Sequence, residues 1–183
     1  ENGLSHLNEH MSFKGTPGFT ARDLAMRMDM IGGNVNAATS KTLTVYYANV
    51  TDENLEEAVS LLTEFVRRPS LDVDDLEREK NVVLEEIRMA QDNYEDVADD
   101  LISRATYEGS VLAQTVLGAT DRVKGYDRSA VRAFREKHYH PANTVLALAG
   151  QVTREQVWAL AEKYLGDWAF TEGVSEYPRA KTN

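Results

Sequence analysis

The chain has 183 residues, a formal net charge of −10 and no cysteine. This length is enough for one domain with a sizeable core, and 42% hydrophobic and 27% charged residues are ordinary for a globular protein. The absence of cysteine excludes a disulfide framework, a thiolate metal site and a cysteine nucleophile. The acidic balance argues against a nucleic-acid partner, and no segment is apolar enough to span a membrane as a helix.

The first predicted element is a helix over residues 4–12, which carries the run His6-Leu7-Asn8-Glu9-His10. Histidines four residues apart lie one turn apart on the same helix face, where they can bind one metal ion. H-x-x-E-H is the inverted form of a zinc-peptidase motif, and a catalytic zinc keeps one position open for water. Glu9 is then free to take and deliver a proton. The alternative is a surface helix that happens to carry two histidines, so a third ligand must come from elsewhere in the chain.

The sequence next predicts a loop over 15–18 and a helix over about 21–31. Two strands follow over 34–39 and 42–50, and then a further helix over about 53–67. Thr20 is expected to cap the first of these helices, and Gly32-Gly33 ends it. The two strands are rich in β-branched and aromatic residues. Thr51 or Asp52 is expected to cap the amphipathic helix that follows.

Residues 71–94 predict a long helix that supplies candidates for the third ligand. Asp72 or Asp74 can cap its start. At about 100° per residue, one stripe of this helix holds the apolar side chains of Leu76, Val83, Ile87, Ala90 and Tyr94. Glu79 and Glu86 lie on the edge of that stripe, whereas Glu85 points away from it. A carboxylate beside a buried face is costly unless it is paired or bound to metal, so Glu86 is the better ligand candidate and Glu79 a candidate supporting partner. The alternative is that both carboxylates flank a core and reach water.

After the long helix the sequence predicts a helix over about 96–106 and then an irregular exposed stretch over 107–126. A helix capped by Asp127 runs to about His138, and a short buried strand follows over 144–149. The last elements are a helix over about 154–165, capped by Thr153, and a polar, linker-like tail over 171–183. His138 and His140 are expected to cap a helix or lie at the surface rather than bind metal. Strands and helices are segregated, which predicts the α+β class, with a mixed or antiparallel sheet and helices packed mainly on one face.

Several runs of this sequence resemble the pitrilysin-like zinc peptidases, and most closely the branch that contains the mitochondrial processing peptidases and their bacterial relatives. The resemblance covers nearly the whole chain. It rests on His6-x-x-Glu9-His10 with Met11 and Phe13-Lys14-Gly15-Thr16, on the glycine turn and strand of residues 32–39, on residues 77–86, on Leu117-Gly118, and on Tyr139-His140-Pro141-Ala142-Asn143.

The resemblance implies that His6, His10 and Glu86 bind Zn²⁺, that Glu9 is the general base, and that Glu79 supports the site. A peptide substrate would bind by strand addition along the strand that contains Asn36, Ala37, Ala38 and Thr39. Members of the family usually carry a second domain of like fold, so a complementary homologous domain or subunit is an expected partner. The resemblance favours a bacterial cytoplasm or a compartment like the mitochondrial matrix, although the residues themselves identify no compartment.

This chain departs from the family's pattern in two respects. Asn8 stands where an apolar residue is usual, and residues 1–183 begin within a turn of the metal motif. We therefore expect a single N-terminal-type peptidase domain without its first strands, belonging to a longer protein. Three alternatives follow: a non-catalytic subunit that docks partners, a metal-dependent hydrolase acting on something other than peptides, and a fragment that binds zinc yet cleaves little.

Overall fold

The computed structural model describes residues 1–169, so the tail predicted over 171–183 lies outside the described residues. The helices are α1 (Leu4–Ser12), α2 (Ala21–Met30), α3 (Leu55–Arg67), α4 (Val73–Asp92), α5 (Tyr94–Thr106), α6 (Thr120–Gly125), α7 (Arg128–His138) and α8 (Arg154–Leu165). Two antiparallel strand pairs join β1 (Gly15–Thr16) to β2 (Phe19–Thr20) and β3 (Asn34–Thr39) to β4 (Thr44–Asn49). The α+β class expected from the sequence is confirmed. Within residues 1–169 no helix combines the length and the apolar character that crossing a membrane requires.

Side-chain caps set the beginnings of most of the longer helices. Thr20 and Asp23 form a reciprocal capping box on α2, and Asp72 accepts hydrogen bonds from the backbone of Asp74 and Asp75 at the start of α4. Asp127 caps α7 in the same way. These caps were predicted from the sequence. The predicted cap of α3 was wrong, because a 3₁₀ turn over Asp52–Asn54 precedes that helix and no side chain caps it.

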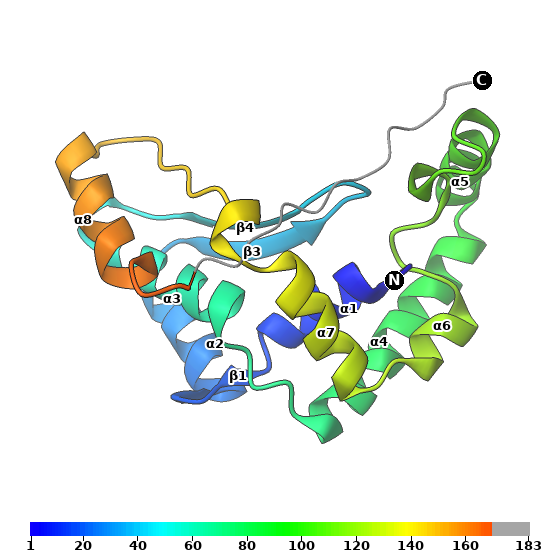
Figure 1. The fold of residues 1–183 in the computed structure, drawn as a ribbon, viewed down its shortest axis with the longest axis horizontal. Coiled ribbons are helices and arrows are strands. Elements are labelled where there is room, and N and C mark those ends of the chain that lie inside the picture. The colour runs from blue at the N-terminus through cyan, green and yellow to red at the C-terminus, as the bar shows by residue number, and fades with distance from the viewer. Residues whose placement is uncertain (170–183) are drawn as a thin grey trace.

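The β3–β4 hairpin packs against one of two hydrophobic clusters. Its register pairs Asn36 with Tyr47 and Thr39 with Thr44, so alternate side chains of β3 point toward the helices. In Figure 1 the hairpin lies along one side of α1, α2 and α3. The cluster between these elements contains Leu24, Ile31, Val35, Ala58, Leu61 and Phe65.

The second cluster joins α1 to α4, α6 and α7 and is the one that positions the metal motif. Leu7 and Met11 of α1 are almost completely buried, as are Val83 and Ile87 of α4. Figure 1 shows α4 running beside α1, with α6 and α7 closing around them. The apolar stripe predicted for residues 71–94 is therefore the face that packs on α1, except that Tyr94 is 89% exposed and begins α5 instead.

Three segments differ from the prediction. The stretch 107–126 contains α6, and its Val123 is fully buried, although six residues are too few to give a visible helical period. Residues 144–149 form no strand, and Val145 is 89% exposed. Their apolar composition is typical of a buried strand, but no strand within residues 1–169 pairs with the segment or covers it. Residues 15–20, of which 15–18 were expected to be a loop, form the short β1–β2 hairpin.

Candidate metal centre

The start of α1 is fixed by a close approach of two glycines. Gly3 precedes the helix with φ 81°, and a Cβ at that position would lie 2.6 Å from the carbonyl oxygen of Leu117. Gly118 has φ 86°, and its own Cβ would lie 2.6 Å from the Cα of Gly3. Only glycine fits two backbones so close together in this conformation. The loop before α6 therefore holds the first turn of α1 in place.

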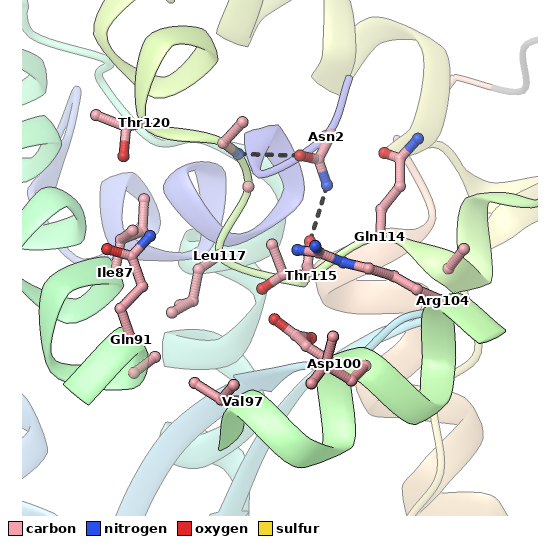
Figure 2. Close-up of a pocket in the computed structure, with 15 residues that line it drawn as sticks. Asn2, Ile87, Gln91, Val97, Asp100, Arg104, Gln114, Thr115, Leu117 and Thr120 are labelled. Atoms are coloured by element: carbon pink, nitrogen blue, oxygen red, sulfur yellow. Dashed lines mark hydrogen bonds between the residues drawn. The ribbon is translucent and has the colours of Figure 1, made fainter. Parts of the chain in front are cut away.

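Asn2 reinforces this contact and borders a hollow of about 550 Å³ between α4, α5 and the 113–120 segment. Its side chain donates to the carbonyl oxygen of Thr115 at 2.8 Å and accepts from the backbone of Ala119 at 3.0 Å. Figure 2 shows Asn2 at one side of the hollow, with Asp100 and Arg104 of α5 at the other. None of the predicted metal or proton-transfer residues lines this hollow, so it is separate from the metal motif.

His6, His10 and Glu86 come together between α1 and α4, as the sequence predicted. The Oε2 atom of Glu86 lies 3.7 Å from Nε2 of His6 and 3.6 Å from Nε2 of His10. One ligand atom from each of the three residues lies within 4.8 Å of the other two. Within residues 1–169, no other group of three or more His or acidic residues meets this distance. Tetrahedral zinc bonds of about 2.0–2.1 Å place two ligand atoms about 3.3 Å apart. The three side chains therefore need only a small inward adjustment to share one zinc ion.

The hydrogen bonding of Glu86 also favours a metal site between these three residues. Glu86 Oε2 is buried and has no hydrogen-bond partner among the described residues. A buried polar atom without a partner is costly, and a carboxylate more so. A divalent cation held by Glu86 and the two imidazoles would supply the missing partner. Glu85, which points away from α1, instead pairs with Arg88 at the surface, so the helical-wheel preference for Glu86 agrees with the geometry.

Glu79 lies behind His10 and orients its ring. Its Oε2 is 3.0 Å from Nδ1 of His10, and its Oε1 is 2.7 Å from Nζ of Lys14. Burial alone raises the pKa of Glu79, but the hydrogen bonds to His10 and Lys14 outweigh it and hold the pKa below its usual value. Because Nδ1 is held by a carboxylate, Nε2 of His10 is left to face Glu86. Lys14 was not singled out from the sequence, although it lies in the quoted run Phe13-Lys14-Gly15-Thr16.

The two imidazoles differ electrostatically. Burial and the neighbouring His10 lower the pKa of His6 to about 4, so His6 is neutral near pH 7 and has a free lone pair. Burial also acts to lower the pKa of His10, but the hydrogen bond to Glu79 and the charges of Glu86, Glu79 and Glu9 raise it overall. The acidic surroundings of His10 favour a positive charge at this place, which a bound metal ion would provide.

Glu9 is held by the strand that was predicted to bind substrate. The hydroxyl of Thr39, the last residue of β3, donates a hydrogen bond to Oε2 of Glu9. Among the remaining predicted substrate-binding residues, Asn36 and Ala38 are exposed and Ala37 is buried. Within residues 1–169, β3 pairs only with β4, so its other edge is unpaired. The structure thus brings the general-base candidate to one end of an open strand edge.

His138 and His140 lie away from this group. Both are buried, at 8% and 3% exposure, so of the two expected roles, helix cap or surface residue, the surface location was wrong. His138 packs on the ring of Phe134, with ring centroids 4.6 Å apart, and lies 3.3 Å from a carboxylate oxygen of Glu1. His138 lies on the buried face of α7, which also carries Val131 and Phe134.

This geometry, two histidines of an H-x-x-E-H helix with a glutamate from a second helix, is the inverted zinc-peptidase arrangement. The family model for insulinase, peptidase family M16, matches residues 1–120, and the model for the peptidase M16 inactive domain matches residues 126–183. The chain belongs to peptidase family M16. The pitrilysin-like resemblance seen in the sequence is therefore confirmed.

Individual relatives agree with this assignment. The chain is 38% identical to the uncharacterized zinc protease YmxG of Bacillus subtilis over 91% of its own length and 41% of that protein. It is 32% identical to the beta subunit of the mitochondrial-processing peptidase of Caenorhabditis elegans over 96% of its own length and 38% of that protein. The chain thus spans about two fifths of the length of these relatives.

Solved structures share the fold. A protease from Helicobacter pylori superposes with a TM-score of 0.91 at 24% identity, over 99% of this chain and 44% of that one. Pitrilysin superposes with a TM-score of 0.84 at 24% identity, over 98% of this chain and 20% of that one.

Proposed function

We propose that this chain is the metal-binding domain of a zinc endopeptidase that cleaves extended peptides, with His6, His10 and Glu86 as ligands. The observation that carries the proposal is the convergence of the three donor atoms, one of which is a buried carboxylate oxygen that has no hydrogen-bond partner among the described residues. The names of the relatives, a zinc protease and a mitochondrial-processing peptidase subunit, support peptide hydrolysis over other hydrolytic reactions.

The residues around the metal position have distinct parts in this reaction. Bound zinc would polarise the scissile carbonyl and lower the pKa of a water molecule. Glu9 would take a proton from the attacking water and pass it to the leaving nitrogen. Thr39 keeps the Glu9 carboxylate oriented through its hydroxyl, and Glu79 keeps the His10 ring oriented through Nδ1.

Substrate would bind along the open edge of β3. Strand addition uses backbone hydrogen bonds for affinity, and the small side chains of Ala37 and Ala38 let two backbones approach closely. A peptide on this edge would lead toward Glu9, because Thr39 at the end of β3 contacts that carboxylate. Presequence-like segments are the substrate class that the processing-peptidase relatives suggest.

The remainder of the active enzyme is proposed to be a complementary homologous domain or subunit, since the chain spans only about two fifths of its relatives. In this proposal residues 1–183 are one N-terminal-type domain with a linker over 171–183. Alone, the chain is expected to bind zinc and cleave little. Robust proteolysis by the isolated chain would contradict this part of the proposal.

A non-catalytic docking subunit is the second candidate, and the match of residues 126–183 to an inactive-domain model favours it. The metal motif argues against it, because the three donor residues and Glu9 are all present in residues 1–120, the part that matches the peptidase model.

The Glu9→Gln variant separates the two candidates. We expect it to bind one equivalent of zinc and to lose peptide cleavage in the presence of the complementary half. Glu85→Gln, a control on the exposed side of α4, should keep both properties. Unimpaired turnover by Glu9→Gln would refute the assignment of the general base, and a wild-type protein without bound zinc would favour the docking subunit.

A further inference from the structure

A group of buried polar side chains lies on the side of α1 that faces away from His6 and His10. At about 100° per residue, Asn8 and Ser12 fall on the opposite half of the helix from the two imidazoles. Both are 0% exposed. Asn8 is also the position at which this chain departs from the apolar residue usual in the family. A buried amide in the middle of the metal motif therefore requires an explanation.

The partner of Asn8 is Arg135 of α7. Its Nη1 donates to Oδ1 of Asn8 at 3.0 Å, and its Nη2 donates to the carbonyl oxygen of Val66 in α3. The guanidinium also lies over the ring of Tyr139, 4.5 Å from its centroid. One side chain thus contacts α1, α3 and the end of α7 at the same time.

Further hydrogen bonds close a ring back to α1. The hydroxyl of Tyr139 is 3.2 Å from that of Tyr46 in β4, and the Tyr46 hydroxyl is 2.9 Å from Oγ of Ser12. Ser12 Oγ in turn donates to the backbone carbonyl of Asn8 at 3.0 Å. We refer to Asn8, Ser12, Tyr46, Arg135 and Tyr139 as the Asn8 ring.

The charge of Arg135 explains why residue 8 is polar. Arg135 is 8% exposed, and no carboxylate within residues 1–169 forms an ion pair with it. Burying a charge is costly unless polar groups compensate for it. The neutral acceptors at Asn8 and Val66, with the face of Tyr139, are that compensation. An apolar residue at position 8 would leave Nη1 without its acceptor.

We propose that the Asn8 ring fixes the rotation and tilt of α1, so that His6 and His10 present their Nε2 atoms to Glu86, and that Asn8 and Arg135 are positioning residues of the metal site. This rests on the proposed zinc site. Asn8 lies between the two histidines in the chain, so a movement of α1 that breaks the contact with Arg135 displaces both imidazoles. Glu86 does not follow that movement, because it belongs to α4.

The test measures zinc affinity by chelator competition and the visible absorption spectrum of the Co²⁺-substituted protein. Asn8→Leu and Arg135→Met should each weaken zinc binding about tenfold or more and alter the Co²⁺ spectrum. The double variant removes the buried charge together with its acceptor, so it should recover most of the lost affinity. If Asn8→Leu does not fold, Asn8→Asp should keep wild-type affinity, because it retains the acceptor, while Tyr46→Phe should weaken binding by opening the ring.

Arg67→Met is the matched control. The Arg67 guanidinium donates to the carbonyl oxygen of Tyr164 at 2.6 Å and to Asp167 at 2.7 Å, on the side of α3 that faces α8. This variant should lose stability while keeping the zinc affinity and the Co²⁺ spectrum. The positioning role is refuted if folded Asn8→Leu and Arg135→Met bind zinc like the wild type, or if Arg67→Met loses affinity to the same extent. A wild-type protein that binds no zinc would contradict the proposed function itself.

Discussion

Replacing Glu79 by Gln tests whether the carboxylate behind His10 acts on the metal. The substitution keeps the size of the side chain and one acceptor oxygen but removes the negative charge. In the structure that charge faces Nδ1 of His10 at 3.0 Å and Nζ of Lys14 at 2.7 Å. Without it the imidazole is a weaker base and a weaker ligand.

Partners of this kind typically change metal affinity by about 10–100-fold. Because glutamine can still accept one hydrogen bond from His10, we expect the lower end of that range for Glu79→Gln. Tenfold corresponds to about 1.4 kcal/mol of binding free energy.

Competition with a chromophoric chelator at fixed pH measures this change. Glu77→Gln is the matched control, because Glu77 also pairs with a lysine, Lys80 at 2.9 Å, on the same helix but away from α1. The control should bind zinc like the wild type. Wild-type affinity in Glu79→Gln, or an equal loss in Glu77→Gln, would refute the reasoning.

Three further outcomes are expected. Glu86→Gln should lose tight zinc binding, whereas Glu85→Gln should keep it; metal analysis after dialysis distinguishes them, and equal zinc content would contradict the choice of ligand. Gly118→Ala should destabilise the fold by about 1–3 kcal/mol in denaturant unfolding, because a Cβ would lie 2.6 Å from the Cα of Gly3. Gly125→Ala, with nothing within 4 Å of its Cβ, should change stability by less than about 0.5 kcal/mol, and similar losses in both would contradict the close approach. Phe65→Ala should lower the free energy of unfolding by about 3–5 kcal/mol in the same assay, because Phe65 is 0% exposed. A smaller loss would contradict this and would mean that neighbouring side chains fill the space left by the ring.

The sequence predicted the parts of this site that depend on helical periodicity. The spacing of His6 and His10 and the apolar stripe of α4 each select one helix face, and packing those two faces together brings Glu86 to the histidines. The same apolar stripe also indicated that Glu79 lies on the side of α4 that faces the metal motif. Periodicity is a reliable guide here because α4 is 20 residues long, so its buried stripe repeats over several turns.

Other features were not predictable because they depend on contacts between distant segments. The Asn8–Arg135 hydrogen bond joins residues 127 positions apart, and no local pattern indicates that a guanidinium lies behind the metal helix. The exposure of Val145 depends on whether a neighbouring strand is present, which the local sequence does not report. The hydrogen bond of Thr39 to Glu9 likewise requires the β3–β4 hairpin to be placed on α1.

The most direct test of the proposed metal centre is a crystal of the zinc-loaded protein measured at the zinc absorption edge. This metal centre requires an anomalous peak about 2.0–2.2 Å from Nε2 of His6, Nε2 of His10 and a carboxylate oxygen of Glu86. A zinc-loaded protein without a peak between α1 and α4, or with Glu86 outside the coordination sphere, would contradict it.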